Sequence, residues 1–347
     1  MINVLIVDDS ATARQMIKLS LEKDKDIKVV GTAQDAFVAR DMIVKLRPDV
    51  ICLDVEMPRM DGITFLRKIM THLPIPVVMV SSLTTKGAKT TLDALNFGAF
   101  DFVAKPHSNI YDGINEMEKD LIEKVKQASL ADPIALQKNL KNYLSKHKIK
   151  HYNLKTTTQK IIAIGASTGG TTALQSLLQT LPRNFPGIVI VQHMPGTFTN
   201  KFASRLNEVC QIEVREAQDG DKILNGTALI ASGDFHLKVV RRGGFYNVQY
   251  NDDAKVSGHK PSVDVLFNSV AKAATSNAIG VILTGMGSDG AKGLKAMHDN
   301  GAKTIAQDEK SSIVFGMPKV AIAQGGVDYI ESLDKIPQKL IDILSDL

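Results

Sequence analysis

The sequence predicts an α/β protein made of two doubly wound domains, each built on a mainly parallel sheet. Short apolar segments rich in β-branched residues alternate with segments of helical periodicity, first over residues 2–128 and again from residue 160. Regular alternation of this kind indicates parallel strands with helices on both faces. The 347 residues suffice for two domains. A stretch without the alternation, residues 129–159, separates the two patterns.

The N-terminal pattern consists of five strand–helix units. Strands are predicted at 2–7, 27–31, 49–54, 76–81 and 100–104, and helices at 11–21, 35–46, 62–72, 87–97 and 112–128. We therefore expect a first domain over residues 1–125 with a (βα)5 arrangement.

The middle stretch is basic. Between Asp132 and Lys160 there is no acidic residue, whereas six lysines occur. We expect a linker at 126–158, partly helical around 134–144. Such a run is usually a solvated segment, and docking to an acidic partner surface is the alternative.

The C-terminal pattern predicts a second domain over residues 159–347. Strands are expected at 161–165, 187–192, 278–283 and 303–306, and helices at 171–181, 197–207, 261–274, 290–300 and 335–344. Pro261 is expected in the first turn of its helix. Short strands with glycine turns over 211–250 predict a β-hairpin insertion.

Composition narrows the class of protein. The net charge of +5 is mild, and no helix-turn-helix motif or clustered basic helix follows residue 125, which argues against nucleic acid as a partner. Cys52 and Cys210 lack metal-binding spacing and are expected to be reduced thiols. Without a leader or a long apolar run, the protein is expected to be cytoplasmic and not membrane-inserted.

Three carboxylates follow neighbouring strands of the first domain. Asp8 and Asp9 come after the first strand, and Asp54 ends the third. The carboxyl ends of parallel strands meet in one crevice, where like charges need a cation such as Mg²⁺. Ser81 ends the fourth strand, and Lys105 follows the fifth. This set favours phosphoryl transfer to Asp54, with a Mg²⁺ site that performs no chemistry as the alternative.

These residues resemble the response-regulator receiver family. The resemblance is carried by Asp8-Asp9, by Asp54 followed by Met57-Pro58-Arg59-Met60-Asp61-Gly62, and by Ser81 and Lys105-Pro106. It implies phosphorylation of Asp54 by a histidine kinase. It also implies Mg²⁺ held by Asp9, Asp54 and the Glu56 backbone carbonyl, with Asp8 assisting, and Phe102 as a switch aromatic.

The second domain begins with a glycine-rich turn, Gly165-Ala166-Ser167-Thr168-Gly169-Gly170, between a strand and a helix. Such a turn either cradles a nucleotide phosphate or presents a nucleophilic serine. His193 follows the next strand, where a dinucleotide site would place an acidic residue. This favours a general base at that position.

Asp289 lies after a later strand, so Ser167, His193 and Asp289 are expected to form a triad at strand carboxyl ends. A nucleotide site stays open as the alternative. Asp289 could also be a mere helix cap before Gly290. His236 and His259 are expected to be structural or at the substrate rim.

Longer motifs resemble the chemotaxis protein-glutamate methylesterase family. They are Ile164-Gly165-Ala166-Ser167-Thr168-Gly169-Gly170, Gln192-His193-Met194-Pro195, Lys260-Pro261-Ser262-Val263-Asp264-Val265-Leu266-Phe267 and Leu283-Thr284-Gly285-Met286-Gly287-Ser288-Asp289-Gly290. The resemblance implies demethylation of glutamyl methyl esters on chemoreceptors, and often deamidation of glutamines. It implies a chemotaxis histidine kinase as phosphodonor, an oxyanion hole of the Thr168 and Met286 backbone N–H groups, and no cofactor for the esterase.

Overall fold

The computed structural model describes residues 1–82, 85–105, 111–134, 136–137 and 160–345. It consists of two compact units, Met1–His147 and Lys148–Leu347, which are called the first and second unit below. No helix within the described ranges is long and apolar enough to cross a membrane.

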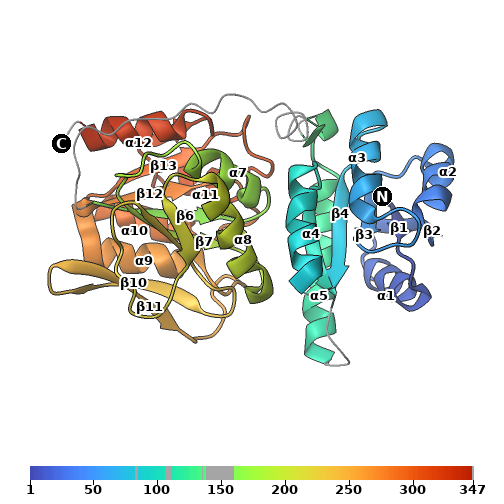
Figure 1. Ribbon diagram of the computed structural model, residues 1–347, viewed down its shortest axis with the longest axis horizontal. Helices are drawn as coiled ribbons and strands as arrows, with labels where there is room; N and C mark the ends of the chain where they lie inside the picture. The colour runs from blue at the N-terminus through green and yellow to red at the C-terminus, as the bar shows by residue number, and fades with distance from the viewer. Residues whose placement is uncertain (83–84, 106–110, 135, 138–159, 346–347) are drawn as a thin grey trace. The chain divides into compact units, whose positions relative to one another are not determined.

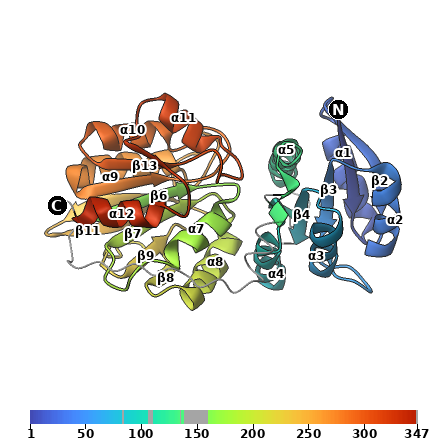
Figure 2. The ribbon, with the colours of Figure 1, turned by 90° about the horizontal axis from the view of Figure 1, so that it is seen from above.

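The first unit contains a five-stranded parallel sheet in the order β2-β1-β3-β4-β5. Helices α1 and α5 pack together on one face, and α2, α3 and α4 cover the other (Figures 1 and 2). The strands are β1 Ile2–Val7, β2 Ile27–Ala33, β3 Val50–Asp54, β4 Val77–Ser82 and β5 Asp101–Lys105. The helices are α1 Ala11–Leu21, α2 Ala36–Leu46, α3 Gly62–His72, α4 Thr85–Asn96 and α5 Tyr111–Ala128.

Side-chain caps fix where three of these helices begin. Ser10 accepts a hydrogen bond from the Ala13 N–H at α1, and Asp61 accepts one from the Thr64 N–H at α3. Asp35 caps α2 in the same way. Such caps satisfy N–H groups that have no partner inside the helix. They therefore fix the first turn of α1 and α3 just after the strands that end near Asp8, Asp9 and Asp54.

The segment after α5 begins as part of the first unit. Helix α5 ends at Ala128, so the boundary predicted at 125 falls in its last turn. Residues 133–134 and 136–137 are helical. Leu136 is only 1% exposed, and the Gln137 side chain donates to the Met70 carbonyl at 2.8 Å. The predicted linker thus starts packed on the first unit, while its residues 138–158 lie outside the described ranges.

The second unit contains a seven-stranded, entirely parallel sheet in the order β14-β13-β12-β6-β7-β9-β8. Helices α7, α8 and α12 cover one face, and α9, α10 and α11 the other (Figures 1 and 2). The strands are β6 Ile161–Ala166, β7 Gly187–Gln192, β8 Glu213–Glu216, β9 Thr227–Ile230, β12 Ala278–Ile282, β13 Lys303–Gln307 and β14 Tyr329–Glu331. The helices are α7 Gly170–Leu178, α8 Gly196–Val209, α9 Val263–Ala274, α10 Ala291–Asp299, α11 Met317–Ala323 and α12 Ile336–Ser345.

The structure corrects the prediction for residues 211–250. Strands β8 and β9 belong to the parallel sheet, and β10 His236–Arg242 pairs with β11 Phe245–Asn251 as the antiparallel hairpin. Periodicity in such short strands does not distinguish sheet strands from hairpin strands. Pro261 was also misplaced, because α9 begins at Val263 with Ser262 as its N-cap. Helix α11 and strand β14 were not predicted.

Candidate active site and phosphorylation site

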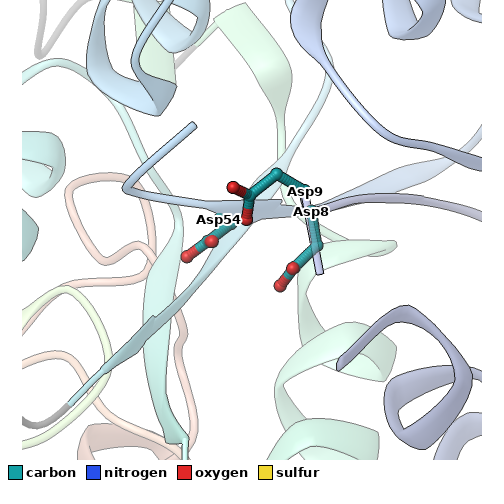
Figure 3. Close-up of side chains that lie close together, drawn as sticks. All are labelled: Asp8, Asp9 and Asp54. Atoms are coloured by element: carbon teal, nitrogen blue, oxygen red, sulfur yellow. The ribbon is translucent and has the colours of Figure 1, made fainter. Parts of the chain in front are cut away.

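The predicted acidic cluster of the first unit, Asp8, Asp9 and Asp54, lies where the strand order of its sheet reverses, between β1 and β3. Asp8 and Asp9 follow β1, and Asp54 ends β3. One carboxylate oxygen from each lies within 4.8 Å of the others (Figure 3). Asp8 and Asp54 are buried, whereas Asp9 is exposed. The predicted convergence of these residues is confirmed.

Lys105 joins this cluster from the end of β5. Its Nζ lies 2.7 Å from Asp8 Oδ2 and 3.0 Å from Asp54 Oδ1. Burial raises the pKa of Asp54, the Lys105 charge opposes the rise and the Asp8 charge adds to it, and together they give a pKa of about 6. One ammonium cannot balance three carboxylates. An oxygen-only donor set with excess negative charge fits a hard divalent cation such as Mg²⁺.

The remaining residues that the resemblance to receivers involves lie on strands of the same sheet or in the loop after β3. Ser81 near the end of β4 is fully buried, and Phe102 on β5 is 4% exposed. Lys124 of α5 donates to the Phe102 carbonyl at 2.6 Å and lies 5.3 Å from the centre of its ring. Glu56 is exposed in the β3–α3 loop, two residues beyond Asp54.

Gly62 sets the shape of the β3–α3 loop. Its N–H donates to the Val55 carbonyl at 2.9 Å, and a Cβ added here would lie 2.0 Å from the Asp54 carbonyl oxygen. Such a distance is far below van der Waals contact, so only glycine fits without moving the backbone of Asp54.

The second site lies where the strand order of the second sheet reverses, between β6 and β12. Ser167 and His193 directly follow β6 and β7, and Asp289 lies in the loop after β12. His193 Nε2 lies 2.8 Å from Asp289 Oδ2. The His193 N–H donates to the Ala166 carbonyl at 3.1 Å, which places His193 beside the Ser167 turn.

Asp289 is buried, and its carboxylate is surrounded by donors. Besides His193, it accepts hydrogen bonds from Ser262 Oγ at 2.7 Å and from the N–H groups of Val263 and Asp264 at 2.7 and 3.1 Å. Burial opposes its ionisation, but hydrogen bonds from His193, Ser262 and Val263 outweigh burial and hold its pKa below the ordinary value. Asp289 does not cap α10, because the N-cap of this helix is Gly290 and has no side-chain hydrogen bond. The Asp289 carboxylate instead binds N–H groups at the N-terminus of α9.

The charge of Asp289 determines the tautomer of His193. An ionised carboxylate only accepts hydrogen bonds, so Nε2 of His193 carries the proton and Nδ1 of the neutral ring carries a lone pair. Nδ1 is buried and has no hydrogen-bond partner in the described part of the chain. A hydrogen bond between Ser167 Oγ and His193 is therefore not formed in this structure.

The Ser167 turn is held by neighbouring loops. Its N–H donates to the Thr284 carbonyl at 3.0 Å, and its own carbonyl accepts from Gly170 N–H at 2.7 Å and Gln192 Nε2 at 2.9 Å. A Cβ on Gly285 would lie 2.8 Å from Ser167 Cβ. The loop that carries Gly285 and Met286 thus lies directly against Ser167.

Two contributors to this site, Ser262 and the loop before α11, received no role from the sequence, and His259 was expected only to be structural or at the substrate rim. Ser262 binds Asp289, and the His259 ring stacks on His193. The loop before α11 forms a wall: Val314 exchanges hydrogen bonds with Thr284 and Gly285. Ser262 lies in a motif that carried the family resemblance, but nothing in its spacing to Asp289 indicates their contact.

Comparison with known proteins identifies both units. Residues 4–112 match the model of the response regulator receiver domain, and residues 162–340 match that of the CheB methylesterase. These matches define a class of protein in which a receiver domain is joined to an ester hydrolase. The nucleic-acid and nucleotide alternatives are thereby disfavoured for the second unit.

Relatives along the whole chain identify the family. A protein-glutamate methylesterase/protein-glutamine glutaminase of Sulfurimonas denitrificans is 60% identical over 99% of both chains. One of Salmonella typhimurium is 49% identical over 99% of this chain and 97% of its own. The Thermotoga maritima CheB methylesterase catalytic domain is 41% identical and matches 54% of this chain and 100% of its own with a TM-score of 0.53. The chain belongs to the CheB methylesterase family.

Proposed function

We propose that this chain hydrolyses glutamyl methyl esters on chemoreceptors, and deamidates specific glutamines, with Ser167, His193 and Asp289 as a catalytic triad. Family membership supports the substrate class. The observation that carries the triad is the buried Nδ1 of His193, which has no partner among the described residues and lies on a ring whose other nitrogen is bound to Asp289.

In the proposed mechanism Ser167 Oγ turns toward Nδ1, transfers its proton there and attacks the ester carbonyl. Asp289 stabilises the resulting imidazolium through Nε2. The leaving methanol takes the proton from Nδ1, which leaves an acyl group on Ser167. Water then attacks this acyl group with His193 as base; the bond to Ser167 Oγ breaks, His193 returns the proton to Oγ, and the glutamate carboxyl group is released. A glutamine side chain reacts by the same steps, with ammonia as leaving group.

The Thr168 and Met286 N–H groups are proposed to bind the oxyanion. Thr168 directly follows Ser167, and Met286 follows the glycine whose Cα packs against Ser167. Each donor in such a position typically stabilises the transition state by about 2.7–4 kcal/mol. No cofactor is required for these steps.

Ser167→Ala tests the nucleophile. Methanol release from methylated receptor is expected to fall to background, because alanine has no group to acylate. Ser204→Ala is a matched control, since Ser204 is an exposed serine whose Oγ donates only to the Asn200 carbonyl of its own helix. Undiminished release by Ser167→Ala would remove Ser167 from the mechanism.

Phosphorylation is proposed to control the hydrolase. A chemotaxis histidine kinase transfers the phosphoryl group to Asp54, with Mg²⁺ bound by Asp8, Asp9, Asp54 and the Glu56 carbonyl. Lys105 and Ser81 then contact the phosphoryl group, and Phe102 transmits the change. The support is a receiver and a hydrolase in one chain, with three carboxylates within 4.8 Å of one another and Lys105 paired with two of them.

We expect the unphosphorylated receiver to restrain the hydrolase. Methanol release should therefore be faster for residues 159–347 than for the whole chain, and a small phosphodonor should accelerate the whole chain only. Asp54→Asn should abolish that acceleration. Equal rates without any response to the phosphodonor would refute the control mechanism while leaving the esterase assignment intact.

A further inference from the structure

The imidazole ring of His259 lies flat against that of His193. The two ring centroids are 3.8 Å apart, and the ring planes differ by 10°. The His193 side chain is only 9% exposed. A second histidine therefore covers one face of the ring that acts as base in the proposed mechanism.

Local structure fixes His259 in this position. Val256 and His259 exchange backbone hydrogen bonds of 3.0 and 2.9 Å around a two-residue turn. Ser257 and Gly258 in this turn both have positive φ, 54° and 83°, as a type I′ turn requires. On the other side, the Ser262 N–H donates to His236 Nδ1 at 3.1 Å. The short segment 256–262 is thus anchored before and after His259.

The same segment binds the acid of the proposed triad. Ser262, three residues after His259, donates its hydroxyl to Asp289. His193 is joined to Asp289 by one hydrogen bond, through Nε2. Because Nε2 lies close to the axis of the Cβ–Cγ bond, a single hydrogen bond at Nε2 restrains rotation of the ring about that bond only weakly, and such rotation moves Nδ1. A flat ring stacked at 3.8 Å prevents this rotation on its side, because tilting would bring the two rings into collision.

We propose that His259 is a positioning residue, whose ring holds the plane of His193 so that Nδ1 points at the position that Ser167 Oγ takes in the reaction. This proposal rests on the function proposed above. The proposal assigns this role to the flat ring at position 259, which acts through His193.

The test compares His259→Phe, which keeps a flat ring, with His259→Leu and His259→Ala, which do not. Each is made in the full chain and assayed for methanol release with kcat and KM separated. We expect Ala and Leu to lower kcat on the order of 10- to 100-fold, the usual cost of a misplaced catalytic group, with KM little changed. Phe should retain kcat within about threefold of wild type. His298→Ala is a matched control, because His298 is 37% exposed on α10 and pairs with Asp299 and Asp328.

Nuclear magnetic resonance supplies a readout besides activity. In the full chain, the His193 ring protons should be shifted upfield by the stacked ring, and this shift should persist in His259→Phe and disappear in His259→Leu. If His259→Ala does not fold, the comparison of His259→Phe with His259→Leu still tests whether a flat ring is needed at this position.

Any of four outcomes would overturn the proposal. They are a wild-type kcat in His259→Leu, an equal loss of kcat in His259→Phe and His259→Leu, a change confined to KM, and no upfield shift of the His193 ring protons in wild type. Each is distinct from failure of the proposed function, which would show as methanol release undiminished by Ser167→Ala.

Discussion

Replacing Asp54 by asparagine is expected to stabilise the first unit at neutral pH when no Mg²⁺ is present. Asp54 is buried beside Asp8, and these surroundings raise its pKa from the ordinary 3.8 to about 6. Asparagine keeps an oxygen that can accept the Val55 N–H, which Asp54 Oδ1 accepts at 2.8 Å. Lys105 keeps its contact with Asp8. The substitution removes the charge of Asp54 and with it the ion pair to Lys105, while the amide oxygen can still accept hydrogen bonds from the same donors. The pKa of about 6 already includes the favourable effect of Lys105, so the net effect of removing the charge is stabilising.

The sign follows from proton linkage. Because the pKa is higher in the folded chain, between pH 3.8 and about 6 the folded state binds more protons than the unfolded state. Stability conferred by this group is therefore fully present below pH 3.8 and is lost as the pH rises through about 6. The difference between the unfolded and folded pKa values of Asp54 lowers the free energy of unfolding by up to about 3 kcal/mol at neutral pH, at about 1.4 kcal/mol for each pKa unit.

The assay is urea unfolding of the full chain, followed by hydrogen-exchange mass spectrometry of peptides from β1 and β3. The free energy of unfolding of Asp54→Asn should exceed that of wild type by about 1–3 kcal/mol at pH 7.5 without Mg²⁺. This difference should vanish near pH 4. Excess Mg²⁺ should narrow the difference by binding wild type. Asp41→Asn is the control, because the Asp41 side chain is 71% exposed. A variant less stable than wild type at pH 7.5, or a difference independent of pH, would refute the reasoning.

Three further substitutions follow from single contacts. Ser262→Ala removes a buried hydrogen bond to the Asp289 carboxylate, a type worth about 1.5–3 kcal/mol, and should lower both thermal stability and kcat for methanol release. Gly62→Ala places a Cβ 2.0 Å from the Asp54 carbonyl oxygen and should destabilise the first unit by about 1–3 kcal/mol in the same exchange assay. Gly285→Ala places a Cβ 2.3 Å from Met317 Sδ and 2.8 Å from Ser167 Cβ, and should slow methanol release about 100-fold with little change in urea unfolding of the first unit.

The elements predicted best from sequence are strands with both faces buried. Strands β3, β6 and β7 are buried at every position, so each is a continuous apolar run that a parallel sheet requires. Their polar ends stand out for the same reason. Asp54 and His193 could be identified because each interrupts or follows such a run at its carboxyl end.

The parts that sequence could not predict depend on contacts between distant segments. Strands β8 and β9 are only four residues each, too short for periodicity to reveal their sheet partners. Ser262 and Asp289 are 27 residues apart and meet only because α9 packs against α10. The stack of His259 on His193 depends on the turn at Ser257, a non-glycine residue with positive φ that no pattern indicated.

In both units the candidate site lies where the order of the strands in the sheet reverses, although the residues at the two sites differ in chemistry. In the first sheet the chain leaves β1 to one side for β2 and crosses back to β3, so the ends of β1 and β3 are neighbours with no helix crossing between them. In the second sheet the ends of β6 and β12 are neighbours in the same way. Loops at such a point can extend without blocking a crossover connection. Asp54 ends one of these strands and Ser167 follows another, so each proposed nucleophile lies at a position that the order of the strands creates before any loop residue is chosen. The loops then supply the difference: acidic groups and Lys105 suit a phosphoryl group, whereas His193 with Asp289 suits an ester.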